Sequence, residues 1–192
     1  MGFDDEARLP PVVVYDANLL YPFHLRNLFV QLGVDYLVSP RWTDTIHDES
    51  MRNLVADGRV SSERLLQTRE LMQRALPGAT VVGFEHRIDS LSLPDADDRH
   101  VLAAAIESGA EAIVTFNVKH FPNDALARFG IAARHPDEFL CALYAEDPEA
   151  VRAALEVARQ NLSVTTPDEG SFITVLERQG LPRFVRELRA GR

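Results

Sequence analysis

Three carboxylates fall within four residues in the middle of the chain, at Asp95, Asp97 and Asp98, and an alanine-rich apolar run follows at once. The side chain of Asp95 suits the start of a helix, because it can accept a hydrogen bond from a free backbone N–H group. Acids are also favoured in the first helical turn, where the helix dipole places partial positive charge. The stretch predicts a helix from about 98 to 108, and taken alone it is most simply an acidic helix start.

Polar residues also follow two predicted strands, far away in the sequence. Asp16 comes directly after the β-branched run 12–15, which is typical of a parallel strand covered on both faces. Asn117 lies just past the end of a second such run, 112–115. Ligands of open α/β sheets bind beyond the carboxyl ends of the strands, so both residues are site candidates. Capping of the next turn explains Asp16 equally well.

A further acid, Glu49, is predicted to lie on the inward face of a helix that begins at 39–40. Trp42, Ile46 and Asn53 are spaced from Glu49 so that all four share one helical face. Burying a carboxylate without compensation costs several kcal/mol. Either a metal ion or a basic partner would offset that cost, and the sequence leaves both open.

The chemistry of these candidates points to a hard cation. Carboxylates and an amide, without accompanying His or Cys ligands, suit Mg²⁺ or Mn²⁺ better than zinc. A divalent ion would relieve the repulsion between the acids and make bound water a better nucleophile, and a second ion could stabilise the leaving oxygen of a phosphodiester. By themselves, the residues predict a metal site in an α/β fold and no particular substrate.

Composition narrows the class of protein. The net charge of −9 argues against broad electrostatic binding to nucleic acid, although an enzyme that meets nucleic acid through metal ions is not excluded. No apolar stretch approaches the roughly 20 residues of a membrane span, so we expect a cytoplasmic protein without membrane contact. The single cysteine, Cys141, lies in an apolar run and is predicted to be a buried small hydrophobe.

The order of elements predicts an α/β fold with three layers, α/β/α, around a central parallel sheet of about five strands. A purely helical pattern begins at Pro136. We therefore expect two parts, an α/β domain at 11–135 and a helical extension at 136–192 that packs on it. The five predicted strands are 12–15, 36–38, 80–83, 112–115 and 131–133.

Four stretches in succession resemble the motifs of PIN-domain ribonucleases. The resemblance is strongest to the VapC-like branch of type II toxins that carries a helical C-terminal extension. It covers residues from about 11 to 135, and the tail ending 181–184 also resembles that branch. The four motifs are Tyr15–Tyr21, Ile46–Glu49, Asp95–Ala105 and Ile113–Phe121.

This resemblance implies a divalent-metal-dependent endoribonuclease, the toxin of a type II toxin–antitoxin pair, which hydrolyses RNA phosphodiester bonds by metal-activated water. By position, Asp16, Glu49 and Asp98 match the acidic triad of the family and would hold Mg²⁺ or Mn²⁺. Asn117 stands where many members have an acid. Asp95 or Asp97 could take that role, and Asp95 is favoured because a spacing of three places it on the same helical face as Asp98. The predicted catalytic set is Asp16, Glu49, Asp95, Asp98 and Asn117.

The family also implies partners and supporting residues. Such toxins pair with a small antitoxin that inserts a basic side chain into the acidic site, and they form homodimers. Asn18 and Thr115 match positions that orient the acids or the water. Several basic residues flank the motifs and could contact RNA phosphates or make structural hydrogen bonds: Arg52, Arg99, His100, Lys119 and His120.

Two alternative functions stay open at this point. One is a PIN nuclease that acts in RNA maturation or on DNA. The other is a degenerate PIN module that binds a partner without cleaving, which the asparagine at position 117 favours.

Overall fold

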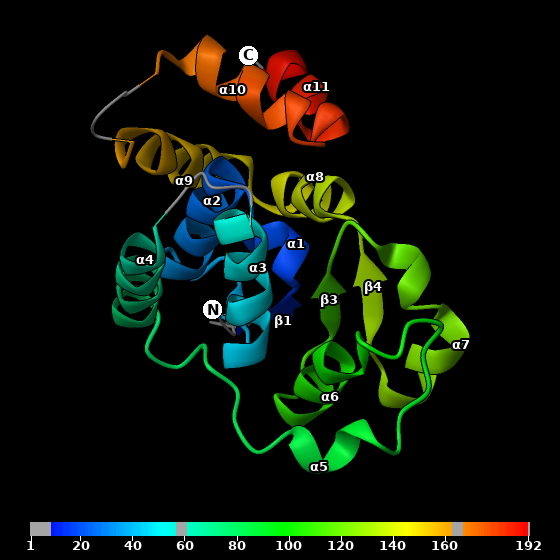
Figure 1. Ribbon diagram of the computed structural model, residues 1–192. Helices are drawn as coiled ribbons and strands as arrows, with labels where there is room; N and C mark the ends of the chain where they lie inside the picture. The colour runs from blue at the N-terminus through cyan, green and yellow to red at the C-terminus, as the bar shows by residue number, and fades with distance from the viewer. Residues whose placement is uncertain (1–8, 57–60, 163–166, 192) are drawn as a thin grey trace, which may run out of the picture.

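The computed structural model describes residues 9–56, 61–162 and 167–191. Four parallel strands form one sheet in the order β2-β1-β3-β4, and Val14 of β1 lies opposite Arg41 on one side and Ile113 on the other. Strands β1, β3 and β4 of this sheet are labelled in Figure 1. The predicted α/β class with a parallel sheet is confirmed. The strands are β1 (Val12–Tyr15), β2 (Ser39–Arg41), β3 (Ala112–Val114) and β4 (Ala132–Arg134).

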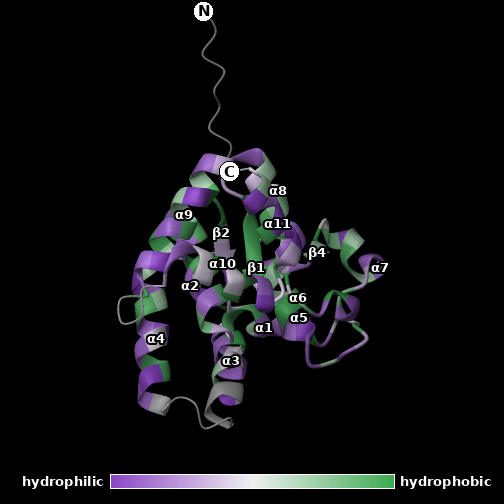
Figure 2. Cartoon of the chain, turned by 90° about the horizontal axis from the view of Figure 1, so that it is seen from above, coloured by the Kyte–Doolittle hydropathy of each residue, from purple (hydrophilic) through white to green (hydrophobic). Residues whose placement is uncertain are grey.

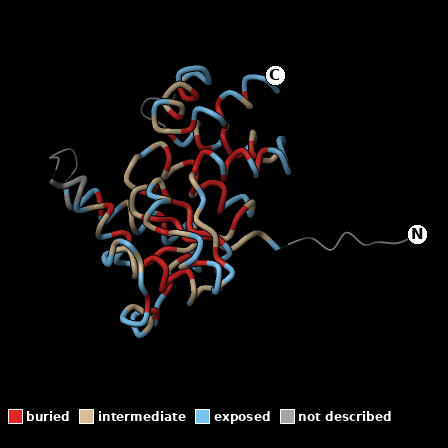
Figure 3. Tube along the Cα trace, turned by 90° about the vertical axis from the view of Figure 1, so that its right-hand side faces the viewer, coloured by how far each residue is buried: buried red, intermediate tan, exposed pale blue. Residues whose placement is uncertain are grey.

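The centre of the sheet is buried on both faces. Val13, Val14 and Tyr15 are completely buried, and so is nearly all of β3. Successive side chains of a strand point to opposite faces, so burial of consecutive residues requires a cover on each face. Helix α6 (Arg99–Glu107) packs against β1 and β3, and α2 (Phe23–Val34) packs against β2. The buried segments run through the middle of the molecule in Figure 3.

The second strand lies three residues later than predicted. The run 36–38 precedes it, and the predicted helix start at Ser39-Pro40 is wrong, because these residues pair with β1. The Ser39 N–H donates to the Pro11 carbonyl at 2.8 Å, so the nitrogen of Pro40 faces away from β1 and its missing donor costs no bond there. Helix α3 (Asp44–Ala56) begins afterwards, and the Thr43 hydroxyl accepts from the Ile46 N–H at its start.

The strand predicted at 80–83 is reduced to a single parallel bridge between Trp42 and Thr80. Trp42 accepts from the Val81 N–H at 2.8 Å and donates to the Ala79 carbonyl at 3.0 Å. Pairing stops there because the neighbouring strand, β2, ends at Arg41 and helix α3 begins at Asp44. The sheet therefore has four strands rather than the five expected.

The acidic stretch forms a turn before its helix. Asp95 accepts from the Asp97 N–H at 3.0 Å, and α6 begins only at Arg99, with Asp98 in the position before it. Asp95 thus caps the turn rather than the helix. The helix starts one residue later than predicted, which leaves Asp98 at the point where chain and helix meet.

Four helices follow the sheet and lie beyond one end of it in Figure 1. They are α8 (Pro136–Glu146), α9 (Pro148–Gln160), α10 (Glu169–Arg178) and α11 (Pro182–Ala190). Helix α9 packs along α2, and α8 packs along α11. Asp137 is buried and accepts from two backbone N–H groups at the start of α11, those of Arg183 at 3.0 Å and Phe184 at 2.8 Å. The extension therefore packs on the α/β domain through α9, and its own helices α8 and α11 pack on each other.

The apolar sides of these helices face inward, while their hydrophilic sides face solvent (Figure 2). Cys141 lies buried in α8, as predicted. None of the helices in the described ranges is both long and apolar enough to cross a membrane. The remaining helical segments are α1 (Ala17–Leu20), α4 (Ser62–Ala75), α5 (Glu85–Ile88), η1 (Val118–His120), α7 (Asn123–Leu126) and η2 (Ala127–Phe129).

Candidate active site

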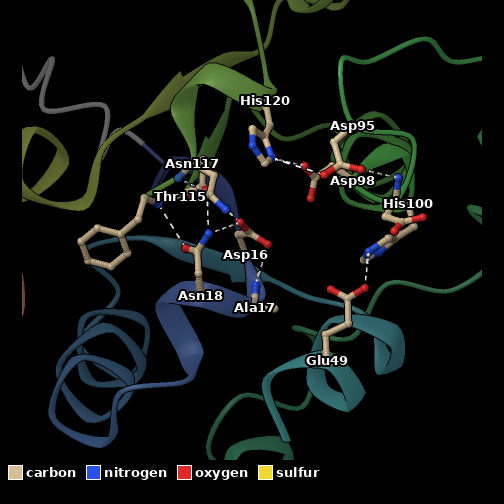
Figure 4. A network of polar contacts seen from close by, with 12 residues as sticks. Asp16, Ala17, Asn18, Glu49, Asp95, Asp98, His100, Thr115, Asn117 and His120 are labelled. Atoms are coloured by element: carbon tan, nitrogen blue, oxygen red, sulfur yellow. Dashed lines mark hydrogen bonds and ion pairs between the residues drawn. The ribbon is translucent and has the colours of Figure 1, made fainter. Parts of the chain in front are cut away.

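The candidate residues gather at the carboxyl ends of β1 and β3. Strand β2 lies on one side of β1 and β3 lies on the other. The strand order therefore reverses between β1 and β3. Such a reversal leaves a crevice where α/β proteins bind ligands. Figure 4 shows Asp16, Glu49 and Asp98 with their carboxylates directed toward one another across this point. The three acids come from the end of β1, from α3 and from the start of α6.

Asp16 is the most buried of the three, at 4% exposure. One of its oxygens accepts from the Ala17 N–H at 2.7 Å and so caps α1, while the other accepts from Asn18 and from Thr115, each at 2.6 Å. Burial raises the pKa of Asp16, the hydrogen bonds from Thr115 and Ala17 lower it by less, and the charges of Asp98 and Glu49 make smaller contributions that raise it. Asp98 and Glu49 thus lie close enough to Asp16 to repel its charge, and Asp16 serves as a cap as well as a site candidate.

Asn18 and Thr115 hold the carboxylate of Asp16 in a hydrogen-bond network. The Thr115 hydroxyl is completely buried and also accepts from the Asn18 amide and from the Asn117 N–H, both at 3.0 Å. The Asn18 carbonyl oxygen in turn accepts from the Phe116 N–H at 3.1 Å. These contacts fix the direction of Asp16, which is the part that the resemblance assigns to Asn18 and Thr115.

Glu49 has a basic partner. Its Oε1 lies 3.1 Å from Nε2 of His100, whose side chain is 9% exposed, while the Glu49 side chain is 33% exposed. His100 thus offers Glu49 one of the two compensations that the sequence left open, a basic partner when its imidazole is protonated, and the metal ion stays the other. His100 is a buried neighbour of the acids rather than a surface contact. The expected alignment of Asn53 with Glu49 concerns a side chain outside the described ones.

Asp95 and Asp98 meet around His120, which the sequence placed only among the flanking basic residues. Its Nδ1 lies 2.7 Å from Asp98 Oδ2 and 3.7 Å from Asp95 Oδ2. One ligand atom from each of the three lies within 4.8 Å of the others, so the group could hold a metal ion. Among the described residues this is the group that meets that distance, and of the predicted metal ligands Asp16, Glu49 and Asp98 it contains only Asp98. Burial raises the pKa of Asp98 and the His120 imidazole lowers it, with burial the larger effect. The signal for His120 in the sequence was its place in the fourth motif, a few residues after the predicted strand 112–115.

The two remaining candidates, Asn117 and Asp97, contribute to the site through their backbones. The Asn117 side chain is exposed, and its described link to the network is through its backbone N–H. Asp97 is exposed and likewise contributes a backbone N–H, to Asp95. Of the two acids considered for the place beside Asp98, the structure thus brings Asp95 there.

The raised pKa of Asp98 has a measurable consequence for stability. Its folded-state pKa exceeds the ordinary 3.8, so the ionised carboxylate costs stability at neutral pH, and that cost disappears as pH falls below the ordinary value. In metal-free buffer we expect Asp98→Asn to raise the Tm at pH 7 and its Tm to approach that of the parent as the pH falls below 3.8. Thermal unfolding in EDTA across this range measures it.

The control is Asp48→Asn, because the Asp48 side chain is 62% exposed and pairs with Arg69 at 3.6 Å. A surface change of this kind is expected to stay within about 0.5 kcal/mol. A lower Tm for Asp98→Asn than for the parent at pH 7 would contradict the claim that burial raises the pKa of Asp98.

Comparisons with known proteins cover both parts of the chain. The PIN domain model matches residues 12–119, and the VapC50 C-terminal domain model matches residues 136–190. A protein named "Putative ribonuclease VapC50", from Mycobacterium tuberculosis, is 58% identical over 57 residues, which is 28% of this chain and 34% of that relative. The matched part thus spans about a third of the relative's length. No solved structure matches the chain significantly.

The PIN domain match covers more than half of the 192 residues, and the fold and the order of motifs agree with it. The second match covers the helices α8 to α11, where the resemblance predicted an extension. The chain therefore belongs to the PIN-domain family, in its VapC-like branch with a helical C-terminal extension.

Proposed function

We propose that this protein is a divalent-metal-dependent endoribonuclease and the toxin of a type II toxin–antitoxin pair. The observation that supports the proposal is that Asp98 and Glu49 act electrostatically on the buried Asp16 at the sheet edge of a PIN-family chain (Figure 4). The name of the mycobacterial relative supports ribonuclease chemistry. The nuclease domain is 11–135, and 136–192 is the extension.

The donor set fits a divalent cation. Asp16 is a buried carboxylate with two further acids beside it, and such a group requires a compensating positive charge. Asp16, Glu49 and Asp98 would hold Mg²⁺ or Mn²⁺, because these ions prefer oxygen ligands. When bound, the ion would polarise the phosphodiester and make the attacking water more acidic. Asn18 and Thr115 keep Asp16 oriented for this task.

Asp95 and Asn117 complete the proposed catalytic set. Asp95 lies with His120 beside Asp98, where the three could share an ion. The His120 imidazole departs from the all-oxygen ligand set that the sequence predicted, and because imidazole is a ligand of transition-metal ions it favours Mn²⁺, a transition metal, over Mg²⁺. Because of this imidazole, we expect Mn²⁺ to support activity at least as well as Mg²⁺.

Asn117 supports the site through the hydrogen bond that its backbone N–H donates to Thr115.

The proposed partners follow from the charge of the site. A protein of net charge −9 can meet RNA where bound cations reverse the local charge. The same acidic site would accept a basic side chain of a cognate antitoxin, which would occupy the place of the cation. We further propose that the toxin acts in the cytoplasm as a homodimer.

The experiment compares end-labelled RNA and a DNA of the same sequence, incubated with the purified chain in Mg²⁺. We expect cleavage of the RNA alone, a loss of at least about 100-fold in EDTA, and recovery with Mg²⁺ or Mn²⁺. Glu49→Gln should lower the rate, whereas Asp48→Asn, its exposed neighbour, should cleave as the parent does.

Equal cleavage of RNA and DNA would favour the alternative PIN nucleases. A chain that binds Mn²⁺ but cleaves neither substrate would contradict the nuclease and favour a module that only binds partners. Cleavage that persists undiminished in EDTA would remove metal dependence from the proposal.

A further inference from the structure

The segment that follows β3 holds Asp16 through three consecutive residues. Thr115 donates to the Asp16 carboxylate, the Phe116 N–H donates to Asn18, and the Asn117 N–H donates to Thr115. Phe116 stands at the middle of this segment. Any shift of its backbone would therefore change the hydrogen bonds that aim Asp16.

The Phe116 ring packs against His135, at the start of α8, and against Gly180, between α10 and α11. It packs edge-on against the His135 ring, with centroids 5.1 Å apart and planes at 88°. His135 caps α8 by accepting from the Asp137 N–H at 3.2 Å. Asp137 in turn anchors the start of α11, which fixes the turn that carries Gly180.

Gly180 allows the close approach of the extension to Phe116. Its φ is +98°, a conformation that residues with a Cβ rarely adopt. A Cβ at this position would lie 2.8 Å from Cε1 of Phe116, so any larger residue must displace the ring. The glycine is required here both by the turn and by the contact with the active-site segment.

We infer that the C-terminal extension positions the catalytic carboxylate, with Gly180 and Phe116 as positioning residues that act through Asn18 and Thr115 on Asp16. The inference rests on the proposed function for the role of Asp16 as a metal ligand. Groups that orient metal ligands typically change metal affinity or activity by 10–100-fold when they are lost. The extension is thus a part of the site as well as a part of the fold.

The experiment measures binding of Mn²⁺ alone, by electron paramagnetic resonance and calorimetry, to the full chain and its Phe116→Ala and Gly180→Ala variants. We expect about 10-fold weaker Mn²⁺ binding for both, at a temperature where circular dichroism shows each variant folded. In RNA cleavage with Mg²⁺ we expect the loss in kcat rather than in KM, because no RNA contact is removed.

Each variant has a matched control. Gly130→Ala places an alanine at a φ of +70° with open space around its Cβ, so it introduces backbone strain without a contact. Phe129→Ala removes a half-buried phenylalanine of η2 whose ring lies under Arg128. Both controls should bind Mn²⁺ as the parent does. Adding Phe116→Leu to Gly180→Ala removes the ring atom that meets the new methyl group and should restore part of the affinity.

Parent-like Mn²⁺ affinity and kcat in folded Phe116→Ala and Gly180→Ala would overturn the inference and leave the proposed nuclease standing. So would equal losses in Gly130→Ala, since strain alone would then explain the effect. A parent chain that binds no Mn²⁺ would instead contradict the proposed function, and this inference would fail with it.

Discussion

Replacing Asp16 by asparagine is expected to lower RNA cleavage by at least about 100-fold, which is beyond the roughly 10–100-fold typical of residues that only support a metal ligand. The variant removes the charge of the most buried acid of the site while keeping a side-chain oxygen that can cap α1. The fold should persist, because Asn also caps helices well. Initial rates with RNA in Mg²⁺, together with far-UV circular dichroism, measure both statements.

The control for Asp16→Asn is Asp44→Asn in the same preparation. Asp44 is an exposed acid of α3 that pairs with Arg69. Its loss removes one negative charge from the chain without touching the site, so cleavage should equal that of the parent. Full activity in folded Asp16→Asn would show that the reaction does not depend on this carboxylate. It would contradict the proposed catalytic set.

The second large effect concerns stability. Phe184 of α11 is completely buried, and its ring packs edge-on against Tyr144 of α8, with centroids 6.0 Å apart. Phe184→Ala removes these contacts and leaves a cavity, which typically costs about 3–5 kcal/mol. That is a large share of the 5–15 kcal/mol that stabilises an ordinary domain. Urea unfolding followed by circular dichroism gives the free energy of unfolding.

The shape of that unfolding curve is part of the prediction. Residues of the sheet and of α11, such as Val13 and Phe184, belong to one continuous hydrophobic core. We therefore expect one transition that shifts as a whole, because loss of the extension exposes the faces that it covers. Phe23→Ala, at a side chain that is 55% exposed, should change stability by only about 0.5 kcal/mol. Two separate transitions, with the extension unfolding alone, would contradict the single core.

The sequence by itself determined the fold class and the central strands, and it supplied the acids that we propose as the site. The run 12–15 and the run ending at 114 are apolar throughout, so local pattern was enough to predict buried parallel strands. Asp16 could be proposed because it directly follows such a strand, and Asp98 because it directly precedes the predicted helix α6. The order of the four motifs then predicted the family, since order is a property of the chain alone.

Local pattern failed where a partner distant in the sequence decides the structure. The position of β2 depends on pairing with β1, which overrides the helix-start signal of Ser39-Pro40. The length of the strand near Thr80 depends on how soon its neighbour ends. Neither the neighbour nor its length can be read from the residues of the strand itself.

The surroundings of the acids were likewise decided by the tertiary structure alone. Helix packing brings His100 to Glu49 across 51 positions of sequence, and the end of β3 brings His120 to Asp98. Gly180 reaches Phe116 only because the turn between α10 and α11 packs against the segment that follows β3. Residue types fix which chemistry a side chain can do, whereas burial, pairing and orientation arise from contacts between segments that the chain separates.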